Sequence, residues 1–234
     1  MTTNIYTDKY KFNGTAYIEV SDIPFSKKEI LDLGEYCKNV NKEFIEIGDA
    51  GEKNHLLVGR FMTDIEEPKF VNNEYTEKVF KIISSKKILN FIKKICNCND
   101  EVYIRRAQYN EITEGCFVGH HLDKDSNPDY LAACVIQFGT DFSGGLYRVY
   151  NKFNPKKFID YKPEYGSLLI SDCDYPHEVT KVEKGRRGSL VFFVSKNNGK
   201  NNRYQKNWLI FPKLKAKFIS MESLLIQKKL RFMF

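Results

Sequence analysis

The sequence predicts a mostly β protein of the α+β class, in which helices come first and a β-rich body follows. Before about residue 100, apolar residues recur with helical spacing. After it, short runs rich in β-branched and aromatic residues alternate with Gly, Asn, Asp and Pro. Such runs are typical of a β-sandwich or barrel. With 234 residues, 42% of them hydrophobic and 14% aromatic, the chain can bury a core of this kind.

Local patterns define the first elements. TAYIEVSDIPFS, residues 15–26, alternates briefly and predicts a strand that ends in a loop. Ser26 and Glu29 have the spacing of a capping box, which predicts a helix over about residues 27–39. Two short strand-like runs around a polar turn follow in residues 43–64.

The second helical region is EYTEKVFKIISSKKILNFIKKICN, residues 74–97, with a break expected at Ser84 and Ser85. The strands of the β-rich body are expected in EVYIRRAQY, CFVGHHLD, LAACVIQFG, GLYRVYN, KKFIDYKP, GSLLISDC, HEVTKV and RGSLVFFVS. SMESLLIQKKLRFMF, residues 220–234, predicts a short amphipathic C-terminal helix.

We expect one domain over residues 1–234, with a helix-rich part over 1–100, a β-rich core over 101–195 and a basic extension over 196–234. The net charge of +7 is uneven, because the chain from Ser195 onward has ten basic residues and one acidic residue. A basic extension could contact nucleic acid, anionic lipid or an acidic partner. A solvated helix and loop is the interpretation that we favour.

The N-terminal residues contain no apolar core of a signal peptide, and no window approaches 18 uninterrupted apolar residues. We therefore expect neither a signal peptide nor a membrane-spanning helix. The six cysteines are irregularly spaced, which favours reduced thiols and a cytoplasmic location.

A metal site is suggested by the stretch FVGHHLDKDSN, in which His121 and Asp123 form an H-x-D triplet. On a strand, side chains two residues apart point to the same face, so this imidazole and this carboxylate can bind one ion. His120 has Leu122 two residues on and is expected to face away. A second histidine would complete the triad of non-heme Fe(II) oxygenases, which leaves positions open for a cosubstrate and dioxygen.

His177, inside the β-rich region, is the candidate for that second histidine. Arg187 follows ten residues later and Ser189 two residues after that. In a strand that begins near Arg187, these two side chains share a face and Arg186 points the other way. A buried guanidinium needs an anionic partner, and a dicarboxylate would supply it.

These motifs resemble those of the 2-oxoglutarate/Fe(II)-dependent dioxygenases, specifically the prolyl-4-hydroxylase-like branch. The stretches that carry the resemblance are QYNEITEGCFVGHHLD, DFSGGLYRVYN, YGSLLI and YPHEVTKVEKGRRGSLVFFV. The resemblance implies a double-stranded β-helix, or jelly roll, with the N-terminal helices packed on it.

The resemblance also implies the roles of individual residues. The iron ligands would be His121, Asp123 and His177, and Arg187 with Ser189 would bind the C5 carboxylate of 2-oxoglutarate. Further cosubstrate contacts would come from Tyr109, which could equally be a core aromatic, and from Gln137. The substrate candidates are Arg148, which is otherwise a surface charge, and Arg60 and His55, which are otherwise surface or packing residues.

The Gly144-Gly145 turn matches the family's turn, where Gly permits positive φ and a close backbone approach.

The implied cofactor is Fe(II), with 2-oxoglutarate and O2 as cosubstrates and ascorbate as a possible reductant. The implied reaction hydroxylates an unactivated C–H bond and converts 2-oxoglutarate to succinate and CO2. The substrate would be an amino acid, a peptidyl residue or another small metabolite. Halogenating relatives lack the carboxylate ligand, so the presence of Asp123 favours hydroxylation.

Two alternatives stay open. The first is a nucleic-acid-directed dealkylating dioxygenase, although GRRGSLVFF lacks the arginine and asparagine spacing of that group. The second is a non-catalytic jelly-roll protein with a structural metal, which would have no need of Arg187. No feature predicts an oligomeric state.

Overall fold

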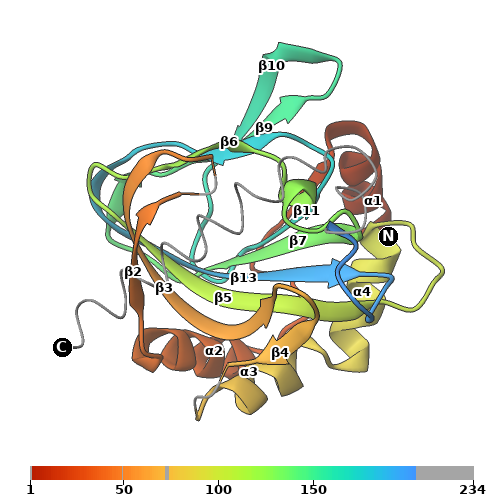
Figure 1. The fold of residues 1–234 in the computed structure, drawn as a ribbon. Coiled ribbons are helices and arrows are strands. Elements are labelled where there is room, and N and C mark those ends of the chain that lie inside the picture. Colours follow the sequence, from red (N-terminus) through yellow and green to blue (C-terminus); the bar gives the residue numbers. More distant parts are fainter. Residues whose placement is uncertain (1, 49, 72–73, 204–234) are drawn as a thin grey trace, which may run out of the picture. The chain divides into compact units, whose positions relative to one another are not determined.

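Two antiparallel β-sheets face each other in this protein, as the computed structural model shows for residues 2–48, 50–71 and 74–203 (Figure 1). Residues 1–201 form one unit, which is described by itself. In the described residues, the larger sheet has the strand order β1-β11-β7-β13-β5-β3-β2, with β4 paired to β3 and β8 to β13. The smaller sheet has the order β10-β9-β12-β6.

The strands of the larger sheet come from the whole length of this unit. They are β1 (Thr15–Ile18), β2 (Glu43–Ile47), β3 (Lys53–Asp64), β4 (Pro68–Phe70), β5 (Tyr103–Thr113), β7 (Tyr130–Gln137), β8 (Phe142–Gly144), β11 (Leu168–Asp172) and β13 (Val182–Ser195). The long strand β13 lies at the centre, between β7 and β5.

The smaller sheet contains β6 (Val118–His121), β9 (Tyr147–Asn151), β10 (Asn154–Tyr161) and β12 (His177–Val179). The β9–β10 hairpin forms one edge of this smaller sheet, and its tip projects outward (Figure 1). A 3₁₀ turn, η1 (Asp123–Asp125), follows β6 directly.

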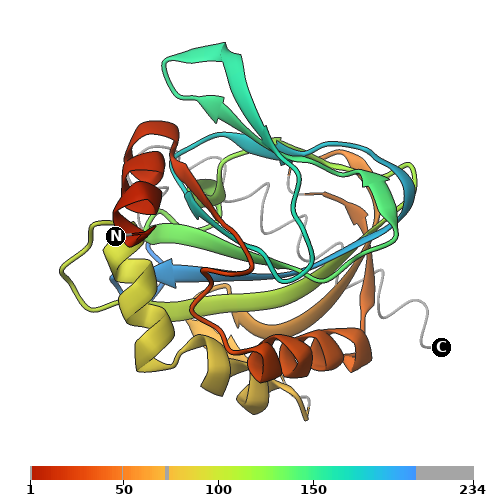
Figure 2. The same ribbon diagram turned by 180° about the vertical axis from the view of Figure 1, so that it is seen from behind.

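The helices α2 (Lys27–Asn39), α3 (Thr76–Ile83) and α4 (Lys86–Ile95) lie on one side of the larger sheet, and α1 (Thr2–Asn13) packs against β1 and α4 (Figure 2). The predicted helix 27–39 is confirmed, with both hydrogen bonds of the capping box between Ser26 and Glu29. The break at Ser84 and Ser85 is also confirmed, since α3 ends and α4 begins there.

Strand alternation sends the side chains of the larger sheet to two different surroundings. On one face, Ile136 and Phe192 join a core with helix residues such as Leu33 and Ile88. On the other face, Val135 and Leu169 pack with Val149 and Val179 of the smaller sheet, among others. The fold is thus the expected mostly β jelly roll with N-terminal helices, and the space between its sheets is where a site can form.

The predicted C-terminal helix and most of the basic extension lie outside the described residues. The single domain over 1–234 stays a prediction. Within the described part of the chain, no helix has the length and apolar character to cross a bilayer.

Candidate active site

A cavity of about 100 Å³ opens between the two sheets, and His121, Asp123, His177 and Arg187 all line it. Its other walls are largely apolar, with Val135 on β7 among them. The cavity therefore combines a few converging polar groups with an apolar lining, which is the usual character of a small-molecule site.

The three predicted metal ligands lie together. His177 on β12 is the direct register partner of His121 on β6, so sheet pairing alone brings the two imidazoles side by side, with ring centroids 4.4 Å apart. Asp123 lies on the 3₁₀ turn rather than on the strand, but Leu122 is extended and still directs the carboxylate to the same side. The three ligand atoms lie within 4.8 Å of one another.

Both imidazoles are oriented by backbone carbonyls. The Nδ1 atom of His121 lies 2.7 Å from the Gly119 oxygen, and that of His177 lies 3.0 Å from the Tyr175 oxygen. Because a carbonyl can only accept, each Nδ1 carries a proton, and Nε2 is the ring atom that is directed at the other ligands. These Nε2 atoms lie 3.6 and 3.5 Å from the two Asp123 oxygens. A carbonyl contact of this kind commonly orients histidines that bind metal.

Asp123 is buried, and its Oδ2 atom has no hydrogen-bond partner among the described residues. Burial raises the pKa of Asp123, but the nearby His177, His121 and Arg106 outweigh that effect, so the pKa lies below its ordinary value. A buried carboxylate oxygen without a partner is costly unless a cation compensates it. Two imidazoles and one carboxylate therefore fit a non-heme iron.

Arg187 lies on β13 in the same cavity, with only 2% of its surface exposed. Its Nη1 atom donates to Ser189 Oγ over 3.4 Å, whereas Nε and Nη2 have no partner among the described residues. Burial lowers the pKa of Arg187 to about 10, so the group is still a cation at neutral pH. Its open donors match what an anion that enters the cavity would need.

The Gly144-Gly145 turn approaches Arg187 closely. Both glycines have positive φ, and a Cβ on Gly145 would lie 2.9 Å from the Arg187 Cδ atom. The turn therefore supports the arginine side chain with bare backbone, as the motif predicts.

The two predicted cosubstrate contacts differ in position. Gln137 is fully buried opposite Ser189, and its Oε1 atom has no hydrogen-bond partner among the described residues, although Gln137 is not itself part of the cavity lining. Tyr109 lies on the other face of the larger sheet, in the core beneath the helices and with Lys42 over its ring. The expected cosubstrate contact of Tyr109 is thus not found, because its neighbours Gln108 and Asn110 face the cavity instead.

Of the substrate candidates, only Arg60 lines the cavity, where it is paired with Glu43. Arg148 points outward from β9 and forms two hydrogen bonds with Asp160, of 2.7 and 2.9 Å. It is therefore a surface charge, as the alternative interpretation had it.

His55 is exposed and packs against Phe44. Its neighbours in β3, Leu56 among them, point into the cavity, and strand alternation directs His55 away from it. His120 likewise packs outward against Tyr150, as predicted.

Two features of the cavity were not anticipated. Tyr147 on β9 stacks on His177, and its hydroxyl is buried. Arg106, Gln108 and Asn110 form a polar row along the cavity face of β5. The signal for this row was in RAQYN, where polar residues recur at every second position of a buried strand.

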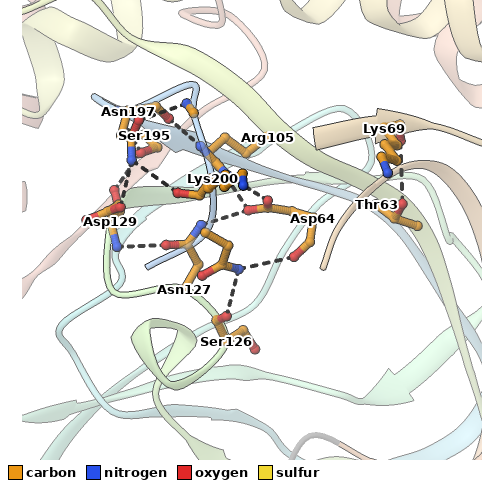
Figure 3. A network of polar contacts seen from close by, with 12 residues as sticks. Thr63, Asp64, Lys69, Arg105, Ser126, Asn127, Asp129, Ser195, Asn197 and Lys200 are labelled. Atoms are coloured by element: carbon orange, nitrogen blue, oxygen red, sulfur yellow. Dashed lines mark hydrogen bonds and ion pairs between the residues drawn. The ribbon is translucent and has the colours of Figure 1, made fainter. Parts of the chain in front are cut away.

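A buried network holds the segment that carries Asp123 (Figure 3). Arg105 donates to both oxygens of Asp64 at 2.9 and 2.8 Å, and the two side chains are fully buried. Asn127, just beyond η1, donates to Asp64 Oδ2 over 2.8 Å. On the far side, Arg105 also donates to the Asn197 carbonyl over 2.7 Å. The network ties η1 to the ends of β3, β5 and β13.

Fold and donor set together define a non-heme metal protein of the jelly-roll oxygenase class. The sequence model of the 2OG-Fe(II) oxygenase superfamily matches residues 107–195, which include all three candidate ligands and Arg187. An oxidoreductase of the 2OG-Fe(II) oxygenase family from Burkholderia pseudomallei is 31% identical, with a TM-score of 0.80, over 86% of this chain and 94% of that one. The chain therefore belongs to the 2OG-Fe(II) oxygenase family.

Two prolyl hydroxylases share the fold. A prolyl-4-hydroxylase from Pseudomonas putida has a TM-score of 0.60 at 14% identity, over 83% of this chain and 99% of that one. The Trichoplax adhaerens enzyme, solved with a peptide fragment of the hypoxia inducible factor oxygen degradation domain, has a TM-score of 0.62 at 13% identity, over 83% and 89%. No curated protein matches the sequence. The protein is accordingly an oxidoreductase that uses iron and 2-oxoglutarate.

Proposed function

We propose that this protein hydroxylates a C–H bond of an amino acid, a peptidyl residue or another small metabolite, with Fe(II) held by His121, Asp123 and His177. In this proposal, Arg187 and Ser189 bind the distal carboxylate of 2-oxoglutarate. The observation that carries it is the buried Arg187 guanidinium, which has two nitrogens without partners and faces the same cavity as the three metal-binding side chains. A purely structural metal site would have no use for this cation.

When bound, Fe(II) and 2-oxoglutarate supply the oxidising chemistry, in which O2 is consumed and 2-oxoglutarate leaves as succinate and CO2. The protein's own residues orient and shield the reactants. Carbonyl contacts fix both imidazole rings, and the buried Asp123 carries the negative charge that a divalent ion requires. Gly145 and Ser189 both contact the Arg187 side chain.

The apolar walls of the cavity have a separate part in the proposal. Val135 and Val191 belong to this lining, and such side chains exclude water from the reacting groups.

We also place the protein in the cytoplasm, because all six cysteines are free thiols in the structure, as in a reducing compartment.

The test is anaerobic addition of Fe(II) and 2-oxoglutarate, followed by admission of O2 and measurement of succinate. A visible charge-transfer band should appear in the wild-type protein and be lost in His177→Ala. Arg187→Leu should lower the affinity for 2-oxoglutarate by about 100-fold, as expected for the loss of a charge-assisted pair.

Arg186→Leu is the matched control, because Arg186 is exposed and pairs with Glu111 at 3.0 Å. Equal loss of 2-oxoglutarate affinity in the Arg186 and Arg187 variants would contradict the assignment of the anchor. A protein that forms no band and makes no succinate would contradict the function itself.

A further inference from the structure

A second cation lies in the cavity and has no part in the proposed function so far. Arg106, on β5, is half-buried and lines the cavity together with Asp123. It is close enough to lower the pKa of that carboxyl. Its Nε atom donates to Gln108 Oε1 over 2.9 Å, and its guanidinium lies 5.5 Å from the centre of the Phe193 ring.

Arg106 differs from most other arginines of this unit in its partners. Up to residue 201, four arginines pair with a described carboxylate, namely Arg60, Arg105, Arg148 and Arg186. The two that pair with none of the described carboxylates are Arg106 and Arg187, and both line the cavity. Because a partly desolvated cation is costly without an anion, their shared location indicates that anions enter here.

The guanidinium of Arg106 is held in position before any ligand arrives. Gln108 accepts from Arg106 through its Oε1 atom and donates from Nε2 to Asn110 Oδ1 over 2.7 Å. Phe193 supports the planar group from β13. The two terminal nitrogens of Arg106 make no hydrogen bond to any described residue, so a planar fork of N–H donors is left for a carboxylate.

Arg106 and Arg187 lie at opposite ends of the paired strands β5 and β13. Arg187 pairs with Ile112, and Phe193 pairs with Arg106, so their backbone positions are about 20 Å apart along the strands. This separation allows the two arginines to bind two different ligands. Between them, Val191 faces the cavity and Ala133 and Val135 line it from β7.

We propose that Arg106 binds a carboxylate of the substrate, and that the substrate is a carboxylic acid with an apolar body that lies along Ala133, Val135 and Val191. The inference rests on the proposed function, because it assigns the anchor at Arg187 to 2-oxoglutarate. It narrows the substrate to acids, either free small acids such as amino acids or acidic residues in a peptide.

The experiment measures binding separately from turnover. Wild-type protein, loaded anaerobically with Fe(II) and 2-oxoglutarate, is titrated with free L-amino acids and with their α-amides, and the shift in Tm gives each dissociation constant. Hexapeptides that contain Asp or Glu, beside their Asn or Gln counterparts, form the second arm. At least one acid should bind about 10- to 100-fold more tightly than its amide, and the arm in which it is found identifies the source of the carboxylate.

Three variants test the residue itself. Arg106→Gln should reduce affinity for that acid by about 10- to 100-fold, while its 2-oxoglutarate dissociation constant stays within about twofold of wild type. Arg106→Lys should recover part of the lost affinity because it keeps the positive charge. Such a recovery would show that the loss in Arg106→Gln is not a general folding defect. Arg148→Gln, which removes an arginine outside the cavity, should change neither constant.

Three outcomes would overturn the inference: equal binding of acids and amides, no binding by any carboxylate of either arm, or loss of 2-oxoglutarate affinity in Arg106→Gln as large as in Arg187→Leu. Each differs from failure of the proposed function, in which the wild-type protein would not bind 2-oxoglutarate in the first place.

Discussion

Gly145 brings the backbone close to the Arg187 side chain. With φ at +59° and a potential Cβ 2.9 Å from Arg187 Cδ, Gly145→Ala should strain the turn and displace the arginine. We expect 2-oxoglutarate affinity to fall by about tenfold, measured by titration of the charge-transfer band.

The matched control for that variant is Gly115→Ala. Gly115 has φ at +85°, but no atom lies within 4 Å of its potential Cβ. It should lose stability through the backbone alone and keep its 2-oxoglutarate affinity. Equal effects of the two substitutions would contradict the supporting contact between Gly145 and Arg187.

Tyr109 gives a second prediction for a single residue. Because its ring lies in the core on the far face of the sheet, Tyr109→Phe should leave the dissociation constant for 2-oxoglutarate within about twofold of wild type. Tyr147→Phe is the informative comparison, since Tyr147 lines the cavity and stacks on His177. A large loss of 2-oxoglutarate affinity in Tyr109→Phe but not in Tyr147→Phe would support the contact between Tyr109 and 2-oxoglutarate that the resemblance implied.

The network around Arg105 acts at the scale of the elements, since it joins β3, β5, η1 and β13. Asp64→Ala would leave Arg105 buried without its carboxylate, and the free energy of unfolding should fall by about 3–5 kcal/mol. Urea unfolding measures the loss.

The control for the network is the exposed pair between Lys28 and Asp32, one helical turn apart on α2. Asp32→Ala should change the free energy of unfolding by at most about 0.5 kcal/mol, because solvent screens such pairs. A loss in Asp64→Ala no larger than in Asp32→Ala would mean that the buried pair contributes little.

The elements also show which features could be predicted from the sequence. The capping box fixed the start of α2, and Ser84 and Ser85 marked the break between α3 and α4, because these signals are local. Helix α1 was missed, since its sequence has no clear apolar stripe and it is held by two buried tyrosines, Tyr6 and Tyr10.

The candidate site was predicted in part. The sequence identified four residues of the site, because their spacing follows the family's motifs. They are His121, Asp123, His177 and Arg187. The face on which Tyr109 lies could not be found in this way, since a shift of one residue reverses every side chain of a strand and only the pairing of β5 with its neighbours fixes that choice.

At the scale of the molecule, the metal should stabilise the fold. The ligands come from β6, η1 and β12, which meet only in the folded state, so Fe(II) binds the native protein and not the unfolded chain. At 100 times its dissociation constant, Fe(II) should add about 2.7 kcal/mol to the free energy of unfolding. Anaerobic thermal unfolding with and without Fe(II) measures this as a rise in Tm.

His177→Ala should abolish the iron-dependent rise in Tm. His120→Ala should retain it, because His120 packs outward against Tyr150 beside the candidate ligand. An undiminished rise in His177→Ala would place the iron elsewhere.

The central position of β13 has a consequence for biosynthesis. Its flanking strands β5 and β7 leave the ribosome first, and β13 is complete only at Ser195. At typical translation rates, β5 waits roughly 4–16 s for this neighbour. During that interval the edges of β5 and β7 that will pair with β13 have no partner strand, and such edges are templates for pairing with other chains. A ribosome stalled before β13 would therefore hold two unjoined parts of a sheet, and these would need a chaperone more than the finished protein does.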